Sequence, residues 1–188
     1  MVTASLRSDA VANRDRLIES ARSLFVERGV DAEMKEIAER AGLGVGTIYR
    51  NFATKDDLVA AIVESCIGEA LVEVRRAMEL PDLRQRVMAN LGVAWSFAER
   101  FGPLIRAMGV RGPQFEHPPV EELDALLLNM FSAGLAAGVI RPGLNPAFVA
   151  HYLATQFQAY VDLRQLHPEA VVREQLTLLV ARAILVDE

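Results

Sequence analysis

A short stretch near the N-terminus carries four hydrogen-bonding side chains within five residues. Thr47 and Tyr49 offer hydroxyls, Arg50 a guanidinium and Asn51 an amide. Hydroxyls and amides can donate to phosphate oxygens, and a guanidinium can donate two parallel hydrogen bonds to a guanine edge. On the outer face of a helix, this combination favours insertion into the major groove of DNA. The alternatives are that Arg50 is a solvated surface charge and that Tyr49 packs inward.

Residue groupings that catalysis would need are missing from the sequence. His117, His151 and His167 are scattered without metal-ligand spacing. The single cysteine, Cys66, lies mid-helix with no evident base nearby, and it excludes an internal disulfide. A glycine-rich phosphate-binding loop would have to follow a β-strand. Because the sequence has no strand-like runs, we expect no such loop. We therefore expect a protein that is not an enzyme, with no catalytic residues, no metal and no cofactor.

The elements that must position the polar stretch are predicted to be helices. Apolar residues recur at helical spacing, and prolines interrupt the later helices. Residues 1–12 are expected to be a disordered lead-in, and residues 111–119 a loop. The sequence thus predicts an all-α fold of about nine helices, over residues 13–28, 33–40, 45–51, 54–78, 83–101, 103–108, 120–137, 146–166 and 168–186.

The first three predicted helices should form one helix-turn-helix unit. The second and third are too short to be stable alone in water, so they must pack against the first. Gly42 can supply the positive φ that the turn between them needs, and Ala41 is small enough for close approach. We expect a DNA-binding domain over residues 1–55. Residues 56–188 should form a second domain, a helical bundle for dimerisation and ligand binding.

A run of fixed spacings between residues 34 and 58 resembles the signature of the tetracycline-repressor (TetR) family of transcriptional regulators. The likeness covers about residues 13–62, and over the rest of the chain it is architectural only. It implies a regulator that holds DNA with its N-terminal helices. The matching pieces are Ile37-Ala38, Ala41-Gly42-Leu43, Gly46-Thr47-Ile48-Tyr49, Phe52 and Lys55-Asp56-Asp57-Leu58.

The resemblance implies a role for each matching residue. Thr47 and Tyr49 should donate to phosphates, and Arg50 and Lys35 should reach base edges. Asn51 stands where the family usually has His, and Glu33 where it often has Thr. The expected DNA-contacting set is Lys35, Gly44, Val45, Gly46, Thr47, Tyr49, Arg50, Asn51 and Lys55.

Lys55 is the member of this set whose position itself needs explaining. It begins the long helix after Thr54, where a cation is disfavoured by the helix dipole. A DNA phosphate beside it would offset that cost. An ordinary first-turn lysine is the alternative. Phe52, which also lies in the matching stretch, is interpreted as packing in the core of the three-helix unit rather than as a DNA contact.

Charge is distributed unevenly along the chain. The formal net charge is −5, which argues against a protein that coats nucleic acid along its whole surface. Residues 1–55 have a net charge of +1, and the remainder has −6. No window is long and apolar enough to span a membrane, and residues 1–12 lack the apolar segment of a signal peptide. We expect a cytoplasmic protein with no membrane partner.

The last two predicted helices carry wide apolar faces. The family resemblance implies a homodimer built on them, which would read a pseudo-palindromic operator with recognition helices about 34–36 Å apart. Burial within one chain is the alternative. The residues concerned are Tyr152, Ala159, Tyr160, Leu163, Val171, Val172, Leu176, Leu179, Val180, Ala183 and Ile184.

The central helices are rich in large, adaptable side chains. Such residues could line a pocket for a small apolar effector, and plain core packing is the alternative. The family resemblance implies a ligand-responsive repressor; the rival hypothesis is a helical dimer that binds a ligand or another protein and has lost DNA binding. The candidate pocket residues are Trp95, Phe97, Phe101, Met108, Phe115, Met130 and Phe131.

Overall fold

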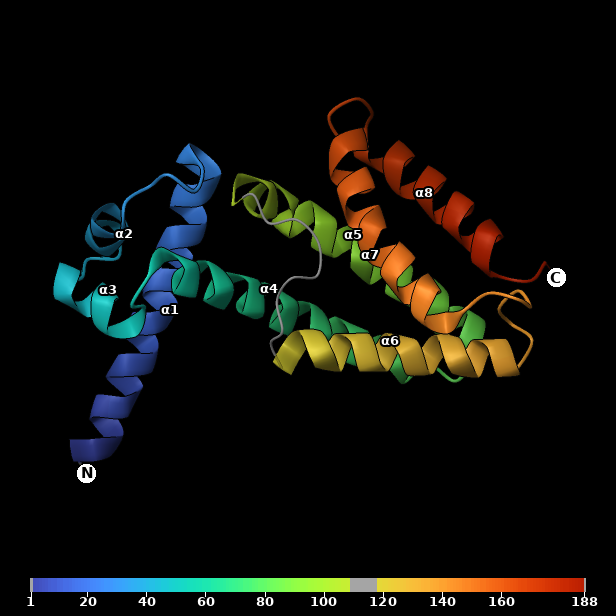
Figure 1. The fold of residues 1–188 in the computed structure, drawn as a ribbon, viewed down its shortest axis with the longest axis horizontal. Helices are drawn as coiled ribbons and strands as arrows, with labels where there is room; N and C mark the ends of the chain where they lie inside the picture. Colours follow the sequence, from blue (N-terminus) through green and yellow to red (C-terminus); the bar gives the residue numbers. More distant parts are fainter. Residues whose placement is uncertain (1, 109–117, 188) are drawn as a thin grey trace. The chain divides into compact units, whose positions relative to one another are not determined.

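The computed structural model describes residues 2–108 and 118–187, and the regular elements within these ranges are all helices (Figure 1). This confirms the all-α prediction, with eight helices in the described ranges against about nine expected. Their bounds are α1 (Val2–Arg28), α2 (Met34–Arg40), α3 (Val45–Asn51), α4 (Lys55–Met78), α5 (Leu83–Ala107), α6 (Pro118–Ala136), α7 (Pro146–Leu163) and α8 (Glu169–Ile184).

The N-terminal lead-in is helical, so the expectation of disorder over residues 2–12 is wrong. α1 begins at Val2 and continues without a break to Arg28. No glycine or proline occurs before Gly29, so nothing in this stretch interrupts the backbone ladder. Gly29 ends the helix with φ +79°, and its N–H donates to the Phe25 carbonyl at 2.9 Å.

The predicted break before Pro103 is also wrong, because α5 passes through it as one helix. Proline removes one backbone donor and crowds the preceding turn, which costs about 3 kcal/mol in a helix interior. Phe101 and Leu104 on either side are buried, at 7% and 3% exposure. Packing of these neighbours offsets the cost of Pro103. Residues 111–117 of the predicted loop lie outside the described residues.

The first of two compact units contains the chain up to Ser65 together with the segment from Pro103 to Met108. Figure 1 shows α2 and α3 beside the second half of α1. Apolar side chains from all its segments make the core. Those with the lowest exposure include Leu17, Ala21, Phe25, Ile37, Ala38, Ile48, Leu58 and Ile62.

The second compact unit contains residues 66–102 and the described residues from 118 onward. Trp95 stacks on Tyr160 with ring centroids 5.7 Å apart, and its indole N–H donates to Thr177 Oγ1 at 2.8 Å. A Cβ at Gly102 would lie 2.4 Å from Val161 Cγ2, so a glycine there allows α5 and α7 to approach closely.

The division between the units falls within α4, after Ser65. The domain boundary expected after residue 55 stays a prediction. Among the described helices, none combines the length and apolarity that crossing a bilayer requires.

Candidate nucleic-acid interface

The turn between α2 and α3 has the geometry that the sequence predicts. Gly42 has φ +65°, in the left-handed region that favours glycine. Its N–H donates to Glu39 O at 3.0 Å, and the N–H of Leu43 donates to Ala38 O at 2.9 Å. These two bonds satisfy carbonyls at the end of α2, so the chain leaves that helix in a fixed direction toward α3.

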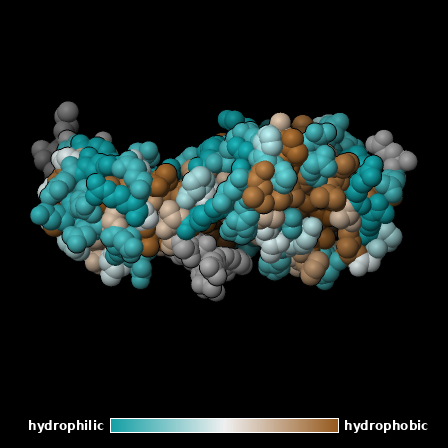
Figure 2. Space-filling view, turned by 90° about the horizontal axis from the view of Figure 1, so that it is seen from above, coloured by the Kyte–Doolittle hydropathy of each residue, from teal (hydrophilic) through white to brown (hydrophobic). Residues whose placement is uncertain are grey.

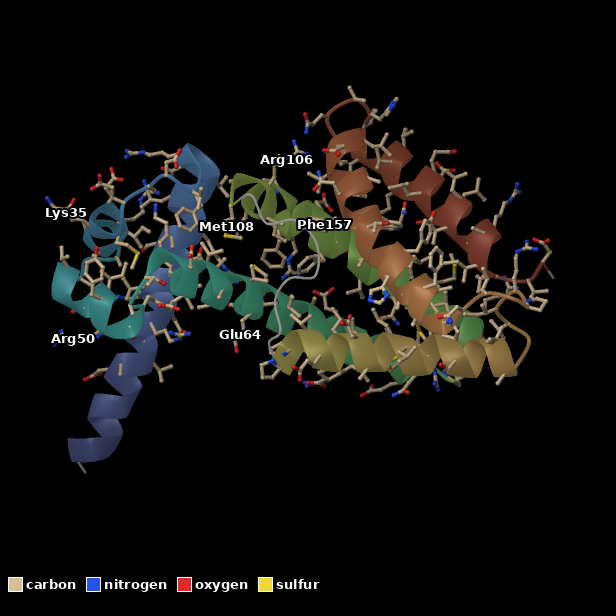
Figure 3. All side chains as sticks on the ribbon, viewed as in Figure 1. Lys35, Arg50, Glu64, Arg106, Met108 and Phe157 are labelled. Atoms are coloured by element: carbon tan, nitrogen blue, oxygen red, sulfur yellow. The ribbon has the colours of Figure 1, made fainter. Side chains whose placement is uncertain are left out.

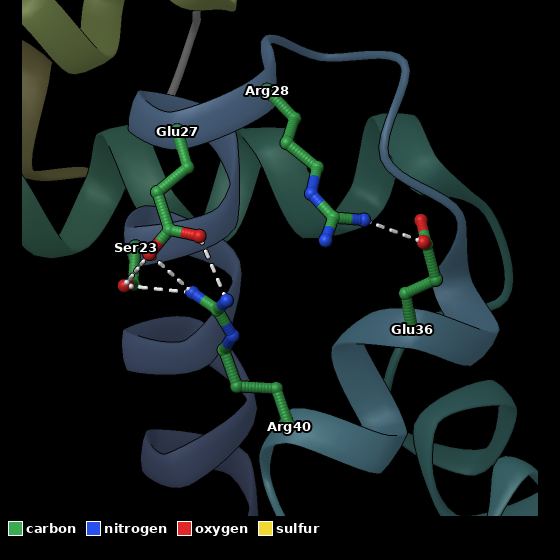
Figure 4. Close-up of polar contacts among 5 residues, drawn as sticks. All are labelled: Ser23, Glu27, Arg28, Glu36 and Arg40. Atoms are coloured by element: carbon green, nitrogen blue, oxygen red, sulfur yellow. Dashed lines mark hydrogen bonds and ion pairs between the residues drawn. The ribbon is translucent and has the colours of Figure 1, made fainter.

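Ion pairs fasten α2 to α1 (Figure 4). Arg40 donates to both carboxylate oxygens of Glu27, at 2.6 and 2.7 Å, and to Ser23 Oγ at 3.0 Å. The hydrogen bond from Arg40 lowers the pKa of the Glu27 carboxyl below its usual value, and the pKa of the Arg40 guanidinium is raised in turn. Arg28 and Glu36 add a second pair at 2.8 Å. Bidentate geometry makes the Glu27 contact directional as well as electrostatic.

One buried residue anchors α3; two of its other residues, Thr47 and Asn51, are half-buried, and the remaining four are exposed. Ile48 is fully buried. Val45 and Tyr49, on either side of it, are 38% and 53% exposed. At Gly44 and Gly46 an added Cβ would meet nothing within 4 Å, so the backbone at the N-terminal end of α3 is open to a partner. These residues form an accessible helix tip.

The polar residues of the predicted interface lie on α2 and α3. Lys35 and Arg50 extend from the same side of this unit, away from α1 (Figure 3). Lys35 is 66% exposed and lies 3.7 Å from Glu39. Arg50 is exposed and donates to Thr47 Oγ1 at 3.1 Å, while Asn51 Nδ2 donates to the Thr47 carbonyl at 2.8 Å. The structure therefore brings these predicted site residues together on one surface; their contact with DNA stays a prediction.

Lys55 differs from the other cations of the set, because its ammonium is bonded to a distant backbone carbonyl rather than to a side chain of its own helix. Its ammonium donates to the Val30 carbonyl at 2.8 Å, and the side chain is half-buried. Thr54 and Asp57 cap the same helix end reciprocally, at 2.9 and 3.1 Å. The Val30 carbonyl gives Lys55 a negatively polarised partner within the chain, and the charge of Lys55 also helps to lower the pKa of the Glu36 carboxyl. Its phosphate contact stays a prediction.

Arg14 is a cation near α3 that sequence reasoning missed. Its guanidinium lies 4.5 Å from the centroid of the Phe52 ring, directly after α3. Phe52 itself is 2% exposed, as the core-packing interpretation expected. The contact links α1 to the end of the recognition helix. No periodicity or local spacing pairs residues this far apart, so the sequence held no signal for it.

Three of the candidate pocket residues are packed in the core of the second unit. Trp95, Met130 and Phe131 are 1%, 4% and 0% exposed, and they belong to one continuous apolar cluster. Buried Asn90 reaches Met130 Sδ through its Nδ2, at 3.5 Å. For these residues the structure shows the core packing that the sequence left open as the alternative.

Two others, Phe97 and Phe101, line a gap between α4 and α5 that is too narrow to hold a water molecule. Their rings lie 5.1 Å apart, and Phe97 also contacts Phe157 of α7 at 5.6 Å. Met108 is buried in the first compact unit, and Phe115 lies outside the described residues. The seven residues are therefore not gathered around a single cavity in the described ranges.

The apolar face of α8 divides into a buried half and an exposed half. Val172, Leu176, Val180 and Ile184 pack within the chain. Others remain exposed on α7 and α8, and Figure 2 shows apolar surface gathered over the second unit. The large exposed side chains are Phe148, Tyr152, Val171, Leu178 and Leu179, of which Phe148 and Leu179 reach 67% and 64%.

Comparisons of sequence place the helix-turn-helix unit among known regulators. Residues 17–62 match a family model described as bacterial regulatory proteins of the tetR family. An HTH-type transcriptional regulator of Staphylococcus aureus (strain bovine RF122 / ET3-1) is 36% identical over 72 residues, 38% of this chain and 39% of the relative. Another from strain USA300 is 43% identical over 60 residues, 31% of this chain and 32% of the relative. The match thus spans less than half the length of these relatives.

Solved structures share the fold over nearly the whole chain. A putative tetR family transcription regulator from Shewanella sp. PV-4 has a TM-score of 0.70 at 22% identity, over 93% of this chain and 99% of that one. The fatty acid degradation regulator FadR from Bacillus halodurans gives 0.75 at 16% identity, over 90% and 94%. A gamma-butyrolactone receptor (ArpA like protein) gives 0.67 at 21% identity, over 94% and 90%.

Proposed function

Since the chain belongs to the tetR family of bacterial regulatory proteins, we propose that it binds duplex DNA as a homodimer and acts as a ligand-responsive repressor. The observation that carries the proposal is the outward face of α3. A seven-residue helix is held by one buried residue, and its exposed side chains and the open backbone at its N-terminal end face away from the core. A helix so placed after a tight turn suits the major groove.

The proposed contacts divide by chemistry. Arg50 and Lys35 reach base edges, with guanine as the bidentate partner of Arg50. Thr47, Tyr49 and Asn51 donate to phosphates, which fixes the register of the helix without reading sequence. The bond from Arg50 to Thr47 leaves other guanidinium donors for a base, since that group carries five N–H donors. Gly44, Val45 and Gly46 form the tip that enters the groove.

A homodimer would cover the exposed apolar side chains of α7 and α8. Large apolar groups concentrated on two helices of one unit are costly to leave in water. A two-fold dimer is also what reading two inverted half-sites about one DNA turn apart requires. Leu179→Arg should therefore give monomers in light scattering. Leu128→Arg on α6, at a residue 40% exposed, is the matched control that should remain dimeric.

The proposed effector is a small apolar molecule bound in the second unit. Support comes from the ring contacts among Phe97, Phe101 and Phe157 beside the narrow gap between α4 and α5, which would have to widen to admit a ligand. One protein of the same fold is a gamma-butyrolactone receptor. Such a molecule would wedge the helices apart and swing α4. It can change operator affinity only by binding one conformation better than the other.

Selection of bound sequences from random duplexes tests the central proposal. The protein should enrich two inverted half-sites whose centres lie about one helical turn apart. Enrichment of a single half-site would contradict the dimer. Indifference to all duplexes at low ionic strength would end the DNA-binding proposal and leave the rival hypothesis, a helical dimer without DNA binding.

A further inference from the structure

The loop between α1 and α2 is held by segments far away in the sequence. The Val30 N–H donates to the carbonyl of Ala107, at the end of α5, at 3.2 Å. The Val30 carbonyl accepts from Lys55 Nζ, at the start of α4, at 2.8 Å. Both backbone polar groups of one loop residue are thus satisfied by two other helices.

Other bonds around this loop are local. Glu33 N–H donates to Glu36 at 2.9 Å, and Arg28 pairs with Glu36 at 2.8 Å. Hydrogen bonding by the Glu33 backbone is the main reason that the pKa of Glu36 is lowered, and the nearby charge of Lys55 adds to it. These contacts shape the loop, while those of Val30 fix it to α4 and α5. Since α2 begins directly after the loop, its position depends on where Val30 is held.

The end of α5 is part of the unit that carries α2 and α3. Leu104 and Met108 are 3% and 7% exposed, and the division between compact units falls between Gly102 and Pro103. Pro103 cannot donate to the carbonyl one turn earlier, so the helix ladder lacks a bond at this division. One continuous helix therefore begins in the second unit and ends in the core of the first.

We propose that residues 104–108 act as a clasp on the α1–α2 loop and that Lys55 is a positioning residue on the other side of Val30. The inference rests on the proposed DNA binding and deepens it. Lys55 holds Val30, which sets α2 and hence α3, and this role is separate from its predicted phosphate contact.

A matched pair of cavity variants on α5 tests the clasp. Leu104→Ala lies in the clasp, and Leu91→Ala, at a residue 2% exposed, lies in the core of the second unit. Both should lower the denaturation midpoint to a similar degree. Only Leu104→Ala should weaken duplex affinity of the folded protein, by about tenfold if one molecule in ten keeps α2 and α3 in place. Equal affinity losses in the two variants would overturn the clasp.

Lys55 variants separate positioning from phosphate contact. Lys55→Ala should weaken DNA binding at every salt concentration, and Lys55→Arg should restore affinity by donating to Val30. A loss of affinity that disappears at high salt, where a phosphate contact contributes little, would overturn the positioning role. Hydrogen exchange at the Val30 amide should speed up in Lys55→Ala. Should wild-type protein bind no duplex, the proposed function fails, and unchanged exchange at Val30 would separately refute the clasp.

Discussion

Replacing Ile48 by alanine should detach the recognition helix. Ile48 is the buried residue of α3 and is 0% exposed. Truncating a buried isoleucine to alanine costs about 2–5 kcal/mol. A helix of seven residues has no stability of its own in water to offset that loss. The cost therefore falls on the docking of α3 as well as on the unit as a whole.

The loss converts into DNA affinity through the docked fraction. Each 1.4 kcal/mol changes the docking equilibrium about tenfold, so 2–5 kcal/mol lowers it by roughly 30- to 4,000-fold. The apparent affinity for DNA equals the intrinsic affinity multiplied by the fraction of molecules in which α3 is docked. Fluorescence anisotropy with a selected duplex should show weaker binding. Denaturation followed by circular dichroism should show a lower midpoint. Ile48→Val, at about 0.5–1.5 kcal/mol, should lie between the wild type and Ile48→Ala in both assays.

Tyr49→Ala provides the contrast on the same helix. Tyr49 is 53% exposed, so its removal should leave the midpoint nearly unchanged while weakening DNA binding. If Ile48→Ala keeps both stability and affinity, α3 is not anchored as described. A stability loss with full retention of duplex affinity would show that the docking of α3 does not limit DNA recognition.

Further substitutions test the turn, the ion pair and base reading. Gly42→Ala places a side chain at φ +65° and should lower the free energy of unfolding by about 1–2 kcal/mol. Gly44→Ala, at φ −70°, should lower it by less. Similar losses in the two variants would refute the turn argument. Because Arg40 lowers the pKa of Glu27, the stability that this pair contributes is present above pH 4.5 and is lost as pH falls through the pKa of Glu27 in the folded protein. Arg40→Met should flatten that part of the plot of the denaturation midpoint against pH. Arg50→Ala should cost about 1–3 kcal/mol on the selected duplex and relax preference at one base pair per half-site, and an equal loss on random DNA would show that Arg50 only positions the unit.

The parts of the interface that the sequence could predict depend on local signals. The turn at Gly42, the bounds of α3 and the N-cap of α4 at Thr54 all follow from residues within a few positions of one another. The ion pair between Arg40 and Glu27 could not be predicted, because it joins faces of two helices whose rotation about their axes periodicity leaves undetermined.

The candidate pocket shows a different limit of sequence reasoning. Large aromatic side chains are suited both to a core and to a ligand site, so composition alone cannot assign them. Trp95 is a core residue because Tyr160 stacks on its ring and Thr177 Oγ1 accepts a hydrogen bond from its indole N–H. Both partners come from helices much later in the chain. Phe97 and Phe101 pack against each other beside a narrow gap that Ala70 of α4 also lines.

Lys55 shows how one physical requirement can be met by two different partners. A lysine at a helix N-terminus needs a nearby negative group, and the family resemblance pointed to a phosphate. The Val30 carbonyl meets the same need at 2.8 Å within the chain, without DNA. Val30 is held in turn by Ala107, so the helix dipole, the loop and the end of α5 form one connected set of contacts. A lysine fixed at this position by such contacts would serve recognition even if it never met the duplex, because α2 and α3 follow the loop that it holds.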